Sequence, residues 1–484
     1  MDPNQTPHTR HRRRWLAATT LVGLTALAGA ATRRHTIAVL PPFPNPTAQF
    51  SAPTGGPVSF GGHLDRSAVQ VGGDGVVRME LVLGAEHATA TAPTERSTTD
   101  LIVVLDRSGS MDGDKIVHAR GAVRELLSQL RDNDRFALIT YSSDAQVTIP
   151  LAPTTTAARD RWRTTVDGIT PGGGTNMSGG LDLALATLGQ PGARRGATRV
   201  ILISDGLANE GDSTQEGLVA RAQRAARSEV SLTTVGVGED FNEYLMTALA
   251  DAGTGNYYFV QRATDLGQVF AREFGAARTT VASNVAVEIV PANGVRVIDA
   301  AGYPLENEGG RVVFRPGTLF SGQERRVWVT FDVPHDTPAE QALGTFALTY
   351  ATGTDTHRLA LTDTPRVACV AAEKDFLAQV DVPAWERAVS VDSFNKMQDE
   401  VARQVKGGNR DAARAAVTRF RTETGALNAE LKSPVVQQKL DALGDLEGRV
   451  DDAFRGADQK AKQNTLSKTH SAAAYDARRA GAKY

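Results

Sequence analysis

The sequence predicts an α/β domain with a doubly wound, mostly parallel sheet, inserted in or flanked by a β-sandwich, plus a C-terminal helical bundle. Three observations support this prediction. Strand-like runs alternate with amphipathic helices over residues 97–276, strand-like alternation replaces helical periodicity over 277–372, and amphipathic helical runs occupy 383–454. The chain has 484 residues, which suggests about three domains.

A signal peptide is predicted for residues 1–31. Arginines at 10–14 form a positive n-region, residues 15–27 form an apolar core, and 28–30 are small residues typical of a cleavage site. The core is shorter than the ~20 residues that a spanning helix needs, so removal is favoured over anchoring. The n-region also resembles a twin-arginine signal. We therefore expect an exported bacterial protein, located in the periplasm, the cell envelope or outside the cell.

A proline-rich linker is predicted for residues 32–57, and residues 58–96 are predicted to form an N-terminal β-hairpin. The two strand-like runs of the hairpin, 67–71 and 76–83, flank a glycine-rich turn. This hairpin is the natural partner for an open edge of the sandwich. The α/β domain would then be an insertion between two parts of one β-domain.

The central α/β domain is predicted from strand-like and helical patterns that alternate along the sequence. Short runs of apolar, β-branched residues read as buried strands, and apolar residues at helical spacing lie between them. We expect strands at 101–105, 136–142, 147–151, 199–204, 231–237 and 256–260, and helices at 113–130, 157–169, 179–188, 216–228, 242–252 and 264–274. The strand at 147–151 is expected at an edge of the sheet.

Three amphipathic runs, 384–405, 410–431 and 435–454, predict a small antiparallel helical bundle because the connections between them are short. The segment 455–484 that follows is basic and has few large apolar residues. We predict a disordered tail there, able to make weak contact with an anionic surface.

Composition argues against several classes of function. The formal net charge is −2, which gives no reason to expect a nucleic-acid partner. Cys369 is the only cysteine, so no internal disulfide can form, and we expect it to fill a core. The chain contains no H-E-x-x-H, G-x-S-x-G, P-loop or zinc-type Cys/His spacing. His87 follows a lone Glu86 and is expected in solvent. We therefore do not expect an enzyme.

Polar residues follow the strand 101–105 at alternate positions: Asp106, Ser108 and Ser110. In an extended backbone this spacing directs all three side chains to the same side. A carboxylate and two hydroxyls are hard oxygen ligands, which suit a small hard cation such as Mg²⁺.

Two further stretches supply partners for these residues. Asp205 follows the strand 199–204, and Thr175 follows a glycine-rich loop. In an open parallel sheet, ligands bind beyond the carboxyl ends of the strands where the strand order reverses. We expect both residues to join Asp106 there.

The order D-x-S-x-S, then G-G-T-N, then S-D-G resembles the metal-ion-dependent adhesion site of the von Willebrand factor type A (VWA) domain, a Rossmann-like fold. The resemblance implies that the metal ligands are Asp106, Ser108, Ser110, Thr175 and Asp205. The implied cofactor is Mg²⁺, or Mn²⁺, with Ca²⁺ as a further option. The implied partner is a protein that presents an Asp or Glu. Outside 97–274 the chain more loosely resembles bacterial envelope VWA proteins related to chloride channel regulators and inter-alpha-trypsin-inhibitor heavy chains.

Other interpretations of the same residues remain open at this point. The two serines could cap the next helix, and the glycines could form an ordinary flexible loop. A calcium EF-hand loop fails, since Met111 and Val117 stand where it needs Gly and Glu. Asp112 and Asp114 are expected in the acidic first turn of the next helix. The competing functions are a metal-dependent hydrolase and an envelope scaffold with a vestigial metal site.

Overall fold

The computed structural model describes residues 45–479, apart from 54, 88–97, 190–195, 239, 278–279 and 354. The predicted signal peptide therefore lies outside the described residues, as does most of the predicted linker. The described end of that linker contains a strand, β1 (Gln49–Ser51). In the part of the chain that is described, no helix is both long and apolar enough to cross a membrane.

The central domain contains a mostly parallel sheet, as the sequence predicts. Its order is β10-β9-β8-β5-β6-β7, and β7 at the edge is antiparallel to β6 while the other neighbours are parallel. The strands are β5 (Thr98–Asp106), β6 (Arg135–Tyr141), β7 (Ala145–Pro153), β8 (Gly196–Ser204), β9 (Val230–Val237) and β10 (Thr254–Val260). The chain builds outward from β5 on both sides, so the strand order reverses between β5 and β8.

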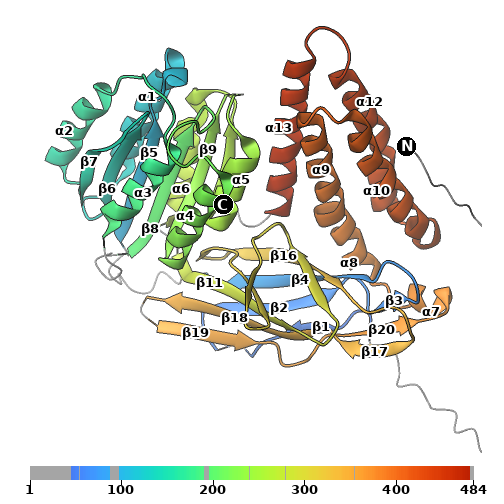
Figure 1. Ribbon diagram of the computed structural model, residues 1–484. Coiled ribbons are helices and arrows are strands. Elements are labelled where there is room, and N and C mark those ends of the chain that lie inside the picture. The colour runs from blue at the N-terminus through green and yellow to red at the C-terminus, as the bar shows by residue number, and fades with distance from the viewer. Residues whose placement is uncertain are drawn as a thin grey trace, which may run out of the picture. The chain divides into compact units, whose positions relative to one another are not determined.

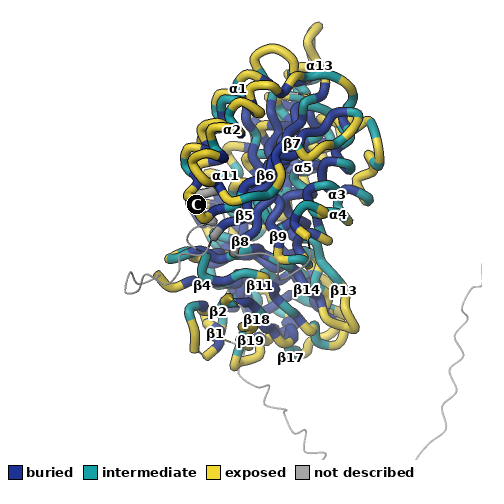
Figure 2. The backbone as a smooth tube through the Cα atoms, turned by 90° about the vertical axis from the view of Figure 1, so that its left-hand side faces the viewer, coloured by how far each residue is buried: buried dark blue, intermediate teal, exposed yellow. Residues whose placement is uncertain are grey.

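Helices cover both faces of this sheet (Figure 1). They are α1 (Asp114–Gln129), α2 (Thr156–Asp167), α3 (Met177–Leu188), α4 (Gln215–Arg227), α5 (Glu243–Ala252) and α6 (Leu266–Ala277), with a 3₁₀ turn, η2 (Ala263–Asp265), before α6. In β5, Leu101, Val103 and Leu105 pack with α1, α2 and α6, whereas Ile102 and Val104 pack with α3, α4 and α5. Figure 2 accordingly shows β5 and its neighbours as buried.

The β-domain has two main sheets that share one core. Their orders are β1-β2-β4-β16-β12 and β13-β14-β11-β18-β19, and a small third sheet has the order β17-β20-β3. Besides β1, the strands are β2 (Val58–Leu64), β3 (Ala68–Gln70), β4 (Val76–Ala85), β11 (Thr280–Pro291), β12 (Arg296–Ala300), β13 (Glu306–Glu308), β14 (Arg311–Phe314), β15 (Leu319–Phe320), β16 (Glu324–Asp332), β17 (Ala339–Ala342), β18 (Gly344–Thr352), β19 (Asp355–Ala360) and β20 (Arg366–Val370). Alternate residues such as Leu81 and Phe331 meet Ile289 and Phe346 between the sheets.

The α/β domain is an insertion in this β-domain. Strand β4, which precedes it, pairs antiparallel with β16, which follows it. The predicted hairpin between 67–71 and 76–83 is wrong, however. Strand β3 pairs in parallel with β20, and β4 instead pairs with β2. The glycine-rich turn is present, but the two strands that it connects pair with distant strands and not with each other.

The C-terminal region is helical, as predicted. It contains α7 (Glu373–Leu377), α8 (Val382–Arg387), a π-helical stretch η3 (Ala388–Ser393), α9 (Phe394–Lys406), α10 (Arg410–Leu431), α11 (Pro434–Asp441) and α12 (Leu443–Ala453). One apolar core joins these helices through residues such as Val401, Val417 and Val450. The Ser433 hydroxyl caps α11 by accepting a hydrogen bond from Val436 N–H (3.1 Å).

A further helix, α13 (Gln459–Arg478), occupies most of the predicted disordered tail, so that prediction is wrong for these residues. Contacts with distant residues hold this helix in place. Tyr257 N–H donates to the Tyr475 hydroxyl (3.1 Å), and Lys468 Nζ pairs with Glu243 Oε2 (3.1 Å). Both Lys468 and Glu243 are buried. The charge of this lysine is therefore neutralised inside the protein rather than presented to an anionic surface.

Cys369 is buried in β20, as expected of a core residue. Its burial raises the pKa of the thiol. A raised pKa lowers the thiolate fraction and so disfavours reactivity.

His470 on α13 gives the fold a sensitivity to acid. Its Nδ1 lies 2.7 Å from Gln398 Oε1 of α9, and burial lowers its pKa to about 4. The unfolded chain binds a proton near the ordinary value of ~6.5, whereas the folded chain resists protonation. Stability is therefore lost as the pH falls from about 6.5 toward 4.

We expect the free energy of unfolding of wild type to fall between about pH 7.5 and pH 5 by about 2 kcal/mol more than that of His470→Gln. Urea unfolding at the two pH values measures this difference. His87→Gln removes an exposed imidazole and should behave as wild type. Equal losses in wild type and His470→Gln would contradict this assignment.

Candidate functional site

Two aspartates lie at the carboxyl ends of neighbouring parallel strands. Asp106 is the last residue of β5, and Asp205 directly follows β8. Both are completely buried. The preceding residues of each strand are apolar and covered by helices on both faces, so the first polar side chains fall at the edge of the sheet. Both residues thus lie at the carboxyl ends of their strands.

The Asp106 carboxylate is held in a fixed orientation. Its Oδ1 accepts a hydrogen bond from Ser108 N–H (2.8 Å), and its Oδ2 accepts one from the Ser204 hydroxyl (2.8 Å). Burial raises the pKa of Asp106, and the nearby charge of Asp205 raises it further, while these hydrogen bonds act in the opposite direction. A positive charge beside the two carboxylates would stabilise their ionised forms.

The hydroxyls of Ser108 and Ser110 lie 3.1 Å apart, and Ser110 Oγ donates to Asp205 Oδ1 (2.7 Å). Neither serine caps a helix with its side chain. Ser108 precedes the 3₁₀ turn η1 (Gly109–Met111) without a capping bond, and α1 is preceded by Gly113. The interpretation of the serines as helix caps is therefore wrong.

Of the two aspartates expected in the first turn of the next helix, only one lies there. Asp114 begins α1, in its acidic first turn. Asp112 lies before the helix and is exposed, where its Oδ1 accepts a hydrogen bond from Gly113 N–H (2.8 Å).

The glycine-rich loop before Thr175 is fixed against the loop that follows β5. Gly172 N–H donates to the Arg107 carbonyl (2.8 Å), and Gly109 N–H donates to the Gly173 carbonyl (3.0 Å). Gly173 has a φ of 82°, a conformation that favours glycine. These bonds argue against an ordinary flexible loop.

Thr175 is buried, and its backbone is anchored by Asn209. Thr175 N–H donates to Asn209 Oδ1 (2.8 Å), and the Thr175 carbonyl accepts from Asn209 N–H (3.2 Å). Gly206 shows where the Thr175 hydroxyl lies, since a Cβ added at Gly206 would be 3.8 Å from Thr175 Oγ1 and 3.2 Å from Ser110 Oγ. The structure thus brings all five predicted residues together around one small space.

Lys115 is the charged member of this cluster that sequence reasoning missed. Its Nζ lies 2.6 Å from Asp205 Oδ2 and 3.3 Å from the Ser110 carbonyl. No sequence pattern marks this lysine, because its reach depends on the direction in which α1 leaves β5. Ser204 was also missed, although it lies within the S-D-G motif.

The five predicted residues provide two carboxylates and three hydroxyls. Such oxygens suit Mg²⁺ or Mn²⁺, which prefer hard ligands and commonly keep bound waters. The described residues contain no group of three or more His, Cys, Asp or Glu side chains that could hold a metal ion. The cluster therefore fits a cation only with the help of its hydroxyls, and the Lys115 ammonium opposes that cation.

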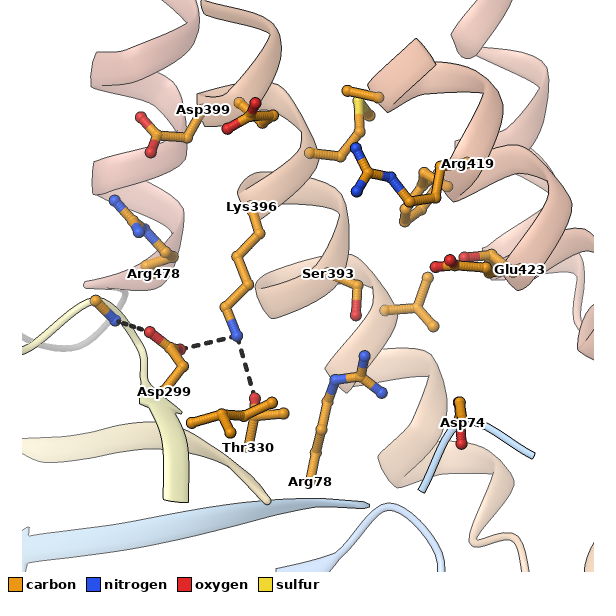
Figure 3. Close-up of a pocket in the computed structure, with 18 of the residues that line it drawn as sticks. Asp74, Arg78, Asp299, Thr330, Ser393, Lys396, Asp399, Arg419, Glu423 and Arg478 are labelled. Carbon is orange, nitrogen blue, oxygen red and sulfur yellow. Dashed lines mark hydrogen bonds and ion pairs between the residues drawn. The ribbon is translucent and has the colours of Figure 1, made fainter. Parts of the chain in front are cut away.

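A cavity of about 1420 Å³ lies elsewhere, between the C-terminal helices, the β-domain and α4 and α5 (Figure 3). None of the five predicted residues lines it. Lys396 in its wall is already paired, with Asp299 Oδ2 at 2.8 Å and Thr330 Oγ1 at 3.1 Å. The candidate site is therefore the polar cluster at the strand ends.

The fold and the polar cluster define a class of domain: a doubly wound sheet with carboxylates and hydroxyls gathered beyond its strand ends. Residues 100–272 match the von Willebrand factor type A domain. The central domain of the chain thus matches the VWA family over these residues. Such domains typically bind other proteins, are mostly not enzymes, and often hold a divalent cation.

Two of the curated relatives match a part of the chain. The chain is 28% identical over 197 residues to the uncharacterized protein YfbK of Escherichia coli (strain K12), covering 40% of this chain and 34% of YfbK. It is 30% identical over 167 residues to inter-alpha-trypsin inhibitor heavy chain H4 of Bos taurus, covering 33% and 18%. The chain therefore spans about a third of YfbK and less than a fifth of the heavy chain.

Two solved structures resemble most of the chain. A von Willebrand factor type A protein from Catenulispora acidiphila has a TM-score of 0.62 at 16% identity, covering 87% of this chain and 96% of that one. The ArnB paralog VWA2 from Sulfolobus acidocaldarius has a TM-score of 0.52 at 16% identity, covering 86% and 98%. At these identities the likeness concerns the fold alone, and it agrees with the predicted fold class.

The role of Ser204 in this cluster can be tested by Ser204→Ala. This change leaves Oδ2 of the buried Asp106 without its hydroxyl donor, so we expect a loss of about 1–3 kcal/mol of unfolding free energy. Urea unfolding in buffer with EDTA measures it. Ser390→Ala is the matched control, because the buried Ser390 hydroxyl has no hydrogen-bond partner among the described atoms. Equal effects of the two changes would contradict the assignment.

Proposed function

We propose that this chain is an exported bacterial binding protein that captures an Asp or Glu of a protein partner through a divalent cation. The cation would be held by Asp106, Ser108, Ser110, Thr175 and Asp205. The convergence of these five side chains beyond the carboxyl ends of β5 and β8 carries the proposal. Export is proposed from the signal-peptide pattern, with the periplasm, the envelope or the exterior as destination.

The composition of the cluster favours capture of an acid. A bound Mg²⁺ or Mn²⁺ would supply positive charge to attract a carboxylate. Ser108, Ser110 and Thr175 offer oxygens without cancelling that charge. Asp106 and Asp205 are buried whereas Ser110 is exposed, so the side of the cluster that is open to a partner lies at Ser110.

The alternatives are less well supported. A hydrolase needs a general base, and the described side chains that bond to the Asp106 and Asp205 carboxylates are the Ser110 and Ser204 hydroxyls and the Lys115 ammonium. Burial holds the pKa of nearby Tyr141 well above its ordinary value, so it is no base. A scaffold that works without metal has one observation in its favour, since Lys115 already neutralises Asp205.

Millimolar Mg²⁺ or Mn²⁺ should raise the melting temperature of the protein, because the site exists only in the folded state. Saturation at about 100 times Kd would stabilise it by about 2.7 kcal/mol. Asp106→Ala and Asp205→Ala should each abolish the shift, measured by scanning fluorimetry against EDTA. Asp132→Ala, an exposed change in the same domain, should retain it. A wild type with no shift and no heat of titration would exclude metal binding.

A partner should be retained only when metal is present. We expect immobilised protein to retain an envelope protein of the source bacterium in Mn²⁺, to release it in EDTA, and to lose it in Asp205→Ala. Affinity capture followed by mass spectrometry measures this, with Asp132→Ala as the control that still binds. Equal retention in EDTA would show that the partner does not use the metal.

A further inference from the structure

We infer that Lys115 is a built-in counter-cation of the candidate site, which a divalent metal ion must displace from Asp205 before the site can hold an acidic partner. The inference rests on the proposed function, because it concerns the regulation of the same site. Lys115 would then set the balance between a metal-free and a metal-loaded form.

Both carboxylate oxygens of Asp205 are engaged. Oδ1 accepts the Ser110 hydroxyl (2.7 Å), and Oδ2 is paired with the Lys115 ammonium (2.6 Å). Asp205 is completely buried, so solvent offers it no replacement for either contact. A cation that binds Asp205 must therefore share an oxygen that already has a partner.

The position of Lys115 is electrostatically unfavourable except for this carboxylate. It lies in the first turn of α1, where the positive end of the helix dipole disfavours a cation. Its stem passes Gly238 at the end of β9, where an added Cβ would lie 3.6 Å from Lys115 Cε. The lysine side chain thus passes the end of β9 and reaches Asp205 at the end of β8.

The lysine can leave without unpacking a core. Its side chain is 31% exposed, whereas the Asp205 side chain is fully buried. A divalent ion beside an ammonium experiences twice the repulsion between two single charges at the same separation. Metal binding and the Lys115–Asp205 pair therefore oppose one another, and the released ammonium would add positive charge near an acidic partner.

The first test is the affinity for Mn²⁺ of wild type and Lys115→Met, measured by isothermal titration. Methionine keeps the length of the stem but removes the charge. We expect Kd to fall about tenfold, which corresponds to about 1.4 kcal/mol. Lys115→Arg keeps the charge and should not tighten binding. Arg124→Met removes a cation from the same helix that pairs with Asp167 instead, and it should leave Kd unchanged.

The outcomes separate this inference from the proposed function. Equal or weaker binding by Lys115→Met than by wild type overturns the counter-cation, while the metal site stands. Binding by neither protein overturns the proposed metal site. Binding by Lys115→Met alone supports the inference and shows that the natural lysine keeps the site free of metal.

The second test follows the amine directly. Acylation of Lys115 by a succinimidyl ester, measured by peptide mass spectrometry, should speed up several-fold on addition of Mn²⁺ in wild type. Lys374 is exposed and lies in α7, outside the candidate site. It serves as the internal reference, and its acylation rate should stay constant. An unchanged Lys115 rate under conditions where titration shows bound Mn²⁺ would overturn displacement.

Discussion

The structure of the site depends on two buried carboxylates at the ends of adjacent strands. Each must be compensated, because an ionised group in a protein interior is costly without partners. Asp106 is compensated by hydrogen bonds from Ser204 and from the backbone of the loop after β5, and Asp205 by Ser110 and Lys115. The same compensation helps to fix the loops, so that the hydroxyls converge beyond the strand ends.

The part of the candidate site that the sequence predicts is the part that follows from the periodicity of the strands. Alternating polar residues after a buried strand fix the side on which Asp106 and Ser110 lie, and the parallel sheet brings Asp205 beside them. Lys115 could not be predicted, since its contact depends on the path of a helix axis. The tail was misjudged for a similar reason: Lys468 finds Glu243 across 225 residues of sequence, and local composition carries no sign of such a partner. The hairpin prediction is wrong because β3 and β4 pair with other strands, β20 and β2, and not with each other.

Rigidity at the opposite side of the domain limits how far an event at the site can spread. Glu273 of α6 is completely buried and accepts hydrogen bonds from Arg199, Thr233, Asn256 and Tyr258 at 2.7 to 2.8 Å. This network ties α6 to β8, β9 and β10 just before the chain enters the β-domain. We therefore expect exchange at the site to stay local, with the β-domain acting as a fixed mount for it.

The most direct measurement is anomalous diffraction at the manganese edge from crystals of the wild-type protein grown in saturating Mn²⁺. We expect one strong peak bounded by Asp106, Thr175 and Asp205, with the Lys115 ammonium turned away from Asp205. A map with no peak there, and with Lys115 still paired to Asp205, would contradict it.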